Sequence, residues 1–351
     1  MLNLNRGILV KDFIKKYKFI LIFAVMAILA AFFPIGGRSL VFHFFEPHSL
    51  ADLSKISPYG LVSNLMSMIL CRMPIMRILV YGALSTSLFV LMKNVVDNKN
   101  SSLLFLAGFF FLLMDKSIFA SSFADFTGFS SYFVGSIFLI ILLNVLVKNS
   151  LARIKRSSLF VLGLVGTSIV PAYSFVFFCV TLFYLFFESR DENEKEMGSF
   201  LLMGEVLGIV HLALSQKLSY SGFSFTLMQR FIPLVSDSNF IVVLILSSMV
   251  LIGSMKIFSY GRRGKIILAM SGILSFLFAS LLAESVIIKY ITYVFFMAGT
   301  IYLLFNIRTS QQFRRRVTYY FLFKIVTILF LCLFGDVEYG SLVFLSFIDI
   351  L

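Results

Sequence analysis

The sequence has few charged residues, no tryptophan and only three cysteines. Charged residues make up 13% of the 351 residues and hydrophobic residues 60%, a balance that a soluble domain with a polar surface does not reach. No polar stretch approaches the roughly 100 residues that a separate soluble catalytic or nucleic-acid-binding domain needs. The cysteines, Cys71, Cys179 and Cys332, share no short spacing, so we interpret them as packing residues rather than as disulfides or metal ligands.

Apolar stretches of roughly 15 to 22 residues recur along the chain, and this is the length with which a helix crosses a bilayer. We predict an all-α polytopic integral membrane protein with about ten or eleven transmembrane helices, in a single membrane domain over residues 1–351. The expected spans are residues 19–33, 75–92, 101–114, 131–147, 158–170, 174–187, 198–215, 239–256, 265–283, 285–306 and 317–334.

The distribution of basic residues predicts the orientation of the chain. Residues 1–18 combine basic side chains with apolar residues at helical spacing, which is typical of a cytoplasmic interfacial helix. We read residues 158–187 as two helices joined by a tight hairpin at Pro171. With the N-terminus inside, inner segments then carry about three times as many Lys and Arg as outer ones. The net charge of +13 is therefore explained by the excess of basic residues on the cytoplasmic side of a membrane protein. It does not require nucleic acid as a partner.

Two segments predicted to lie outside, 34–74 and 216–238, are longer than simple connectors. In the first, an apolar face at helical spacing predicts a helix that lies along the membrane and covers a cavity. An interfacial helix without a catalytic part is the alternative. The residues of this face are Leu50, Leu53, Leu61, Leu65, Met68 and Ile69.

The carboxylates of the first long loop are candidate acid-base groups. Glu46 or Asp52 could take a proton from an acceptor hydroxyl near the membrane face, and solvated loop charges are the alternative interpretation. We predict no metal site from His43, Glu46 and His48, because Pro47 breaks the helix that would aim them at one ion.

Residues 119–133 are expected to connect two spans on the outer side. They combine aromatic residues with five serine and threonine hydroxyls, a glycine and the carboxylate of Asp125. Aromatic faces beside hydroxyls and a carboxylate are typical of a pocket for a sugar or a lipid headgroup. The alternative is an ordinary turn within an interfacial aromatic belt.

Two ionisable residues, Glu205 and Lys324, are expected inside spans. Each lies about 10 to 12 Å from the cytoplasmic entrance of its span, where an unpaired charge is costly. Their equal depth predicts an ion pair between two helices, with a proton or ion relay as the alternative.

The order of these features resembles the GT-C-like bacterial membrane proteins of the glucosyltransferase type, which are found with surface-polysaccharide genes. The shared features are a basic start, one span, a long outer loop that ends in Asn64-Leu65…Cys71-Arg72, and a short outer connection. In that connection the family has an aromatic-x-Gly-x-x-Asn-Tyr motif. This chain matches it at Gly128 and Tyr132 and has Ser131 in place of the Asn. The resemblance covers at most residues 1–220.

The resemblance implies a glycosyltransferase of the bacterial cytoplasmic (inner) membrane. It would move a sugar from a polyprenyl-phosphate-linked donor to a cell-surface glycan or lipid-linked acceptor on the outer face. No cofactor is implied with certainty, the need for a divalent metal stays open, and partners would be membrane proteins of a polysaccharide pathway.

The resemblance also implies roles for individual residues. Such proteins carry an acid directly after the first span, where this chain has Pro34-Ile35-Gly36-Gly37-Arg38, so Asp52 or Glu46 would be catalytic. Arginine matches phosphate oxygens with two donors, so Arg72 and Arg230 would bind the donor phosphate. The other expected substrate-binding residues are Arg38, Asp125 and Tyr132.

Other functional classes fit the same pattern of spans. An O-antigen or capsule-type polysaccharide polymerase also has ten or more spans and two enlarged outer loops, and loop arginines would carry its reaction. A transporter or flippase would use Glu205 and Lys324 as a relay near the membrane midplane. A non-catalytic membrane subunit would explain the missing acid after the first span.

Overall fold

The computed structural model describes residues 17, 19–33, 35, 39–44, 46–49, 52–53, 59–96, 120–147, 150–189 and 191–214. Every regular element within these residues is a helix. Three segments are long and apolar enough to cross a membrane, namely Pro74–Leu91, Phe126–Leu146 and Glu192–Leu214. The all-helical, multi-pass class predicted from the sequence is therefore confirmed in this coarse form. Five of the expected spans, residues 101–114 and the four beyond residue 238, lie outside the described residues.

The N-terminal half consists of an apolar helix, Phe19–Phe32, followed by α2 (Ser39–Phe44), α4 (Leu61–Arg72) and α5 (Pro74–Val96). Only Met73 separates α4 from α5. Its backbone is extended, with φ −111° and ψ 94°, because the ring of the following proline disfavours the helical conformation. Pro74 then begins α5, at the position where a helix tolerates proline best.

The segment expected to be an outer turn is instead mostly helical. It comprises η1 (Ala120–Ala124), α8 (Phe126–Gly128), η2 (Phe129–Phe133) and α9 (Val134–Val147). Asp125 interrupts the stretch and caps α8 by accepting a hydrogen bond from the backbone N–H of Thr127. Residues 122–137 are all buried, so an interfacial turn is the wrong description. The hydroxyls that suggested a turn find partners inside the protein.

The second half of the described chain contains η3 (Leu151–Arg153), α10 (Arg156–Thr167), α11 (Pro171–Phe183) with η4 (Tyr184–Glu188), and α12 (Glu192–Leu214). Three residues, 168–170, separate α10 from α11, and Pro171 lies in the first turn of α11. The prediction of two helices around Pro171 is therefore confirmed.

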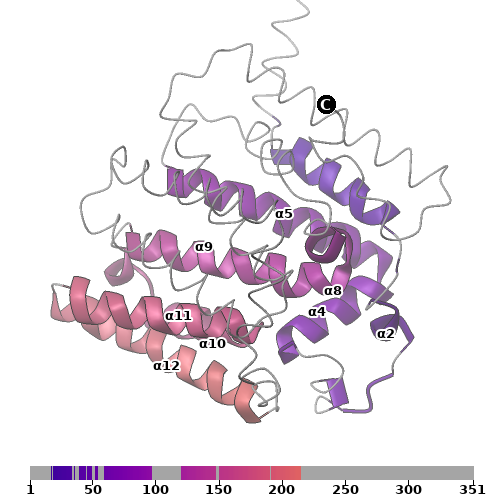
Figure 1. Cartoon of the computed structure of the whole chain (residues 1–351). Helices are drawn as coiled ribbons and strands as arrows, with labels where there is room; N and C mark the ends of the chain where they lie inside the picture. The colour runs from indigo at the N-terminus through magenta and orange to yellow at the C-terminus, as the bar shows by residue number, and fades with distance from the viewer. Residues whose placement is uncertain are drawn as a thin grey trace, which may run out of the picture.

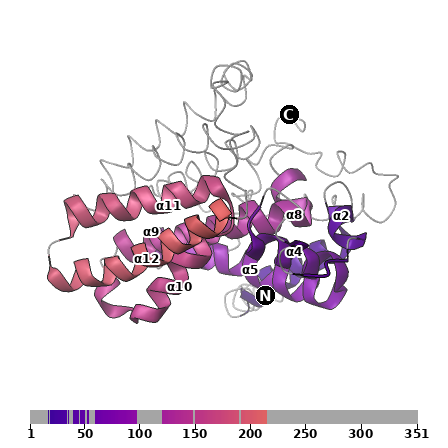
Figure 2. The same ribbon diagram turned by 90° about the horizontal axis from the view of Figure 1, so that it is seen from below.

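The described helices form two groups beside α9. Helix α5 runs along one side of α9, while α2, α4 and α8 gather near one end of α9, and α10, α11 and α12 lie together along its other side (Figures 1 and 2). Within the second group, α10 packs most extensively against α12.

Glycine allows the close packing of α10 on α12. A methyl group on Gly204 would meet the carbonyl of Phe160 and would come within 2.9 Å of the backbone nitrogen of Leu164. A methyl on Gly208 would come within 2.8 Å of the Leu164 carbonyl. Helices that pack in lipid use small residues four positions apart in this way, because close backbone approach is their main source of van der Waals contact.

Helix α4 buries a largely polar face. Its buried residues are Ser63, Asn64, Ser67, Leu70 and Cys71, whereas Leu65 is 41% exposed. The apolar residues that the sequence singled out on this helix, Leu61, Leu65, Met68 and Ile69, are partly or fully exposed. The serine and asparagine side chains have hydrogen-bond partners within the protein, and an apolar side chain on the outer surface has no desolvation penalty in lipid.

Candidate functional site

The buried polar side chains at the α2–α4–α8 end form a group that we call the hydroxyl cluster. They come from α2, from α4 and from the stretch that includes α8 and η2, segments that are far apart in the sequence. Every member is at most 8% exposed. The members are Ser39, Ser63, Ser67, Asp125, Thr127 and Ser130.

Asp125 is the carboxylate of the cluster. Ser39 Oγ donates a hydrogen bond to Asp125 Oδ1, and the backbone N–H of Thr127 donates to the same oxygen over 3.3 Å. Ser39 Oγ also lies 3.2 Å from the hydroxyl of Thr127. A carboxylate that accepts several hydrogen bonds keeps its charge at little cost even when water is largely excluded.

A second part of the cluster joins α4 to η2. Ser67 and Ser130 share a short hydroxyl–hydroxyl hydrogen bond, and Ser63 Oγ lies 3.4 Å from Ser130 Oγ. Ser130 also donates to the carbonyl of Thr127 over 2.9 Å. Two serines one turn apart on α4 therefore meet one serine of the facing helix, which fixes the rotation of α4.

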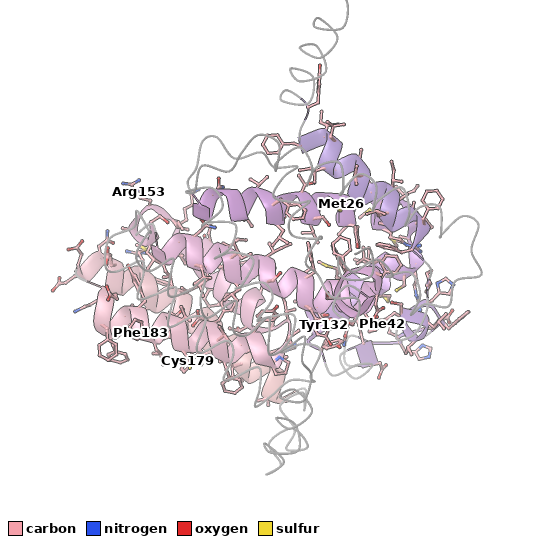
Figure 3. The ribbon with its side chains drawn as sticks, turned by 45° about the horizontal axis from the view of Figure 1, so that its top comes forward. Met26, Phe42, Tyr132, Arg153, Cys179 and Phe183 are labelled. Atoms are coloured by element: carbon pink, nitrogen blue, oxygen red, sulfur yellow. The ribbon has the colours of Figure 1, made fainter. Side chains whose placement is uncertain are left out.

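Aromatic rings border the cluster on one side. The hydroxyls of Tyr59 and Tyr132 are hydrogen-bonded, and their rings meet edge to face with centroids 5.6 Å apart. Tyr81 stacks on Phe129 at 4.0 Å. Figure 3 shows Tyr132 and Phe42 at this end of the molecule, far from Cys179 and Phe183. Rings, hydroxyls and a carboxylate thus lie together, which is the combination predicted from the sequence of residues 119–133.

Two arginines lie at the C-terminus of α4. Arg72 Nε donates to the Phe42 carbonyl over 3.0 Å, and Arg77 Nε donates to the Leu70 carbonyl over 2.8 Å. The guanidinium of Arg77 also lies 4.8 Å from the centre of the Phe126 ring. Cations here stabilise the free carbonyls at the end of a helix. They also place positive charge next to the hydroxyl cluster.

Cys71 lies within electrostatic range of Asp125, Arg77 and Arg72. Burial raises the pKa of its thiol to about 11, so the thiol is protonated at neutral pH and is a poor nucleophile. This agrees with its interpretation as a packing residue, and Cys179 is half-buried in α11. Cys332 lies outside the described residues.

The two predicted catalytic carboxylates lie near the surface. Asp52 accepts a hydrogen bond of 2.8 Å from Ser49 Oγ, and its own backbone N–H donates back to that oxygen. The next residue, Leu53, is buried, and its carbonyl accepts a hydrogen bond of 2.9 Å from Asn64 of α4. Asp52 is thus accessible but lies on an anchored segment, whereas Glu46 is exposed in a stretch without helical structure.

The predicted site residues are only partly brought together. Asp125 and Tyr132 lie in and beside the cluster, and Arg72 lies at the same end of the molecule. Glu205 lies in the other group of helices, buried on α12. Arg38, Arg230 and Lys324 lie outside the described residues. The sequence reading missed Ser39, Ser67, Tyr59 and Arg77; the spacing of Ser63 and Ser67 by one helical turn was the available signal.

An apolar groove of about 770 Å³ lies between helix Phe19–Phe32, α5 and α9. The only hydroxyls in its lining, Thr86 and Ser87, each donate to a carbonyl of their own helix over 2.8 Å. The groove therefore presents hydrocarbon. Its other lining residues are Phe19, Ile20, Phe23, Ala83, Leu84, Val90, Leu91, Ile137, Phe138 and Ile141.

Within the part of the chain that the structure describes, no three His, Cys, Asp or Glu side chains gather to hold a metal ion. No protein-family model, curated protein or solved structure matches the chain.

Proposed function

We propose that this protein is a membrane glycosyltransferase that transfers a sugar from a polyprenyl-phosphate-linked donor to a surface glycan or lipid-linked acceptor. The observation that carries the proposal is the convergence of Asp125, hydroxyls and aromatic rings at the α2–α4–α8 end. Sugar-binding sites combine the same groups, because rings cover the apolar faces of a sugar while carboxylates and hydroxyls form hydrogen bonds with its hydroxyl groups.

Two further features support a donor of this kind. Arg72 and Arg77 add positive charge at the same end of the molecule, and arginine is suited to a phosphate. The apolar groove between helix Phe19–Phe32, α5 and α9 is of a kind that accepts a hydrocarbon chain. A lipid-linked sugar phosphate contains a sugar, a phosphate and a hydrocarbon chain, and the hydroxyl cluster, the two arginines and the groove suit these three parts in turn.

In this proposal Asp52 is the general base. It would take the proton of the acceptor hydroxyl as that oxygen bonds to the anomeric carbon and the donor phosphate leaves. Its accessibility and its anchoring through Leu53 and Asn64 favour it over Glu46. Asp125 would position the sugar, since its carboxylate already accepts two hydrogen bonds through one oxygen.

The test is an analysis of lipid-linked and surface glycans from cells with and without this protein. Asp52→Asn is expected to lower transfer at least about 100-fold at unchanged protein level, while Glu46→Gln, the matched control in the same segment, retains most activity. Loss of one sugar from otherwise full-length chains supports the proposal. Collapse of the glycan to single repeat units would instead identify a polymerase, and unchanged glycans would refute both.

A further inference from the structure

Glu205 is buried between three helices, where it takes no part in the proposed transfer. Its side chain is on α12 and is 0% exposed. Thr181 of α11 donates to Glu205 Oε1 over 2.6 Å, and Thr167 of α10 donates to the Glu205 carbonyl over 3.1 Å. Glu205 Oε2 is buried and has no hydrogen-bond partner within the described part of the chain. One residue thus contacts both neighbouring helices and keeps one polar atom unsatisfied.

The backbone of α10 covers Glu205 closely. A methyl group on Gly163 would come within 2.9 Å of the Glu205 nitrogen. On the α11 side, the thiol of Cys179 interacts electrostatically with the glutamate. An ionised carboxylate with a single hydrogen-bond donor in surroundings of this kind is strongly disfavoured, because burial removes its hydration without replacing it.

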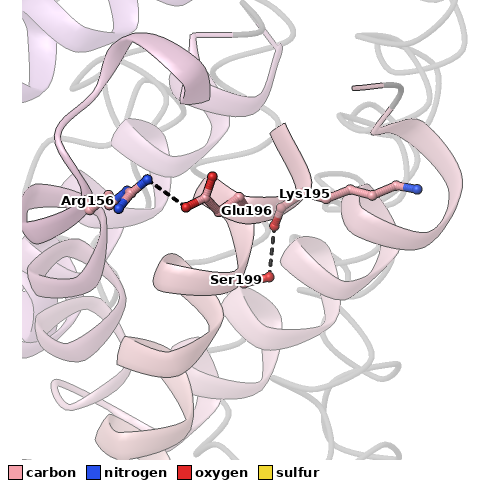
Figure 4. Close-up of polar contacts among 4 residues, drawn as sticks. All are labelled: Arg156, Lys195, Glu196 and Ser199. Atoms are coloured by element: carbon pink, nitrogen blue, oxygen red, sulfur yellow. Dashed lines mark hydrogen bonds and ion pairs between the residues drawn. The ribbon is translucent and has the colours of Figure 1, made fainter. Parts of the chain in front are cut away.

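Cations of the elements packed around Glu205 lie far from it. On α10, Arg156 pairs with Glu196 at 2.6 Å (Figure 4), and both side chains are about half exposed. Glu196 is nine residues from Glu205, or about 13 Å along α12. Lys195 of α12 is exposed and one residue farther away.

The remaining titratable side chains of these elements do not provide a cation next to Glu205. His211 is six residues farther along α12, about 240° around the helix. On α11 and η4 they are Tyr173, Cys179, Tyr184 and Glu188, and Tyr184 donates to Glu194 of α12 over 3.1 Å. Glu192, at the start of α12, is exposed. Arg153 of η3, which also packs against α12, is exposed, so the described elements supply no counter-ion for Glu205.

We propose that Glu205 is a proton-binding site: a neutral carboxylic acid at neutral pH, whose proton leaves only when α12 separates from α10 and α11. The proton removes the charge that the surroundings cannot accommodate, and Thr181 satisfies one oxygen. Separation of the helices admits water, which stabilises the carboxylate and releases the proton. Proton release and helix separation are thus coupled in both directions.

Infrared spectroscopy of the full chain in lipid nanodiscs at pH 7 tests this proposal. The difference between wild type and Glu205→Gln is expected to contain the C=O stretch of a protonated carboxylic acid. Glu196→Gln is the matched control on the same helix, and its difference spectrum is expected to contain carboxylate stretches. Carboxylate stretches in the Glu205 difference spectrum would overturn the proposal. The ion pair with Lys324 expected from the sequence gives that result, and Lys324→Met would then lower its intensity.

A second variant keeps the test valid if Glu205→Gln does not fold. Thr181→Val retains the glutamate and removes the donor to Oε1, so it should shift the frequency of the carboxylic-acid band. A spectrum in which no protonated-acid band responds to this variant refutes the proposal.

The coupling has its own measurement, namely thermal unfolding as a function of pH. The closed state holds one proton more than the opened state, so the closing equilibrium should weaken as pH rises above about 4.3, the ordinary value for Glu, by up to about tenfold per pH unit. Glu205→Gln should remove this component of the pH dependence. Identical pH profiles for the two proteins would contradict the coupling.

Discussion

Asp125 and Glu205 are both buried carboxyl groups, but the protein surrounds them differently. Asp125 lies among hydroxyls and accepts hydrogen bonds from Ser39 and from a backbone N–H. Glu205 lies against closely packed helix backbones and has one donor for two oxygens. The first environment stabilises a charge and the second excludes one. We infer from the comparison that the number of donors around a buried acid, and not burial alone, determines which form it takes.

The largest expected effect comes from breaking the packing that encloses Glu205. Gly204→Leu would force a side chain into Phe160 and Leu164 of α10, so we expect α12 to separate from α10 and a loss of about 3 kcal/mol or more in the free energy of unfolding. Val206→Leu is the matched control, because Val206 is two residues away and 43% exposed. Thermal unfolding in detergent measures both. Equal stability of the two variants would mean that α10 and α12 are not in close contact.

The sequence predicts much of the helical framework because apolar length and proline position dictate it. The start of α5, the end of α12 and the break before Pro171 follow from these signals, whereas α12 begins at Glu192, six residues before the expected span. The glycines at 204 and 208 lie four residues apart, which is a readable packing signal. The sequence does not indicate which helix they contact, since the α10 residues that they meet, Phe160 and Leu164, carry no packing signal of their own.

The hydroxyl cluster was harder to predict, because its members come from three separate segments. Asp125 and Tyr132 were found through the composition of residues 119–133. Ser39 and Ser67 were missed, since a serine in an apolar helix looks the same whether it bonds its own backbone or a distant partner. The apolar residues of α4 did not indicate which face is buried either, because in lipid an apolar side chain can face outward at little cost.

Removing the carboxylate of Asp125 should have the next largest effect. Asp125→Ala removes the carboxylate acceptor of the Ser39 hydroxyl and of the Thr127 N–H, which are then left only their weaker mutual contacts at 3.2 and 3.3 Å; loss of a buried hydrogen-bond acceptor costs about 1–3 kcal/mol. We expect a loss of stability in this range, measured by chemical unfolding. Asp52→Ala is the control, because that carboxylate contacts only the nearby Ser49 among its described hydrogen bonds. A fully stable Asp125→Ala protein would mean that the cluster does not hold α2 against α8.

Replacing each of the two acids by its amide tests which of them is charged. Glu205→Gln replaces a neutral acid by a neutral amide that can still accept from Thr181, so the loss of stability at pH 7 should be under about 1 kcal/mol. Asp125→Asn removes the negative charge to which two donors are hydrogen-bonded, so it should lower the free energy of unfolding by more, about 1–2 kcal/mol. Unfolding of both variants under one condition measures the difference. The reverse order would show that the charge is on Glu205 and not on Asp125.

The smallest effect is expected at the surface of the same helix. Arg156 and Glu196 are joined at 2.6 Å, but their side chains are 58% and 49% exposed, so water and salt screen the pair and ordering two long side chains offsets part of the attraction. Glu196→Gln should change the free energy of unfolding by no more than about 0.5 kcal/mol, and the change should shrink further at high salt. Unfolding at low and high ionic strength measures both. A larger effect that persists in salt would mean that this end of α12 is buried in the assembled protein, because only desolvation protects an ion pair from screening.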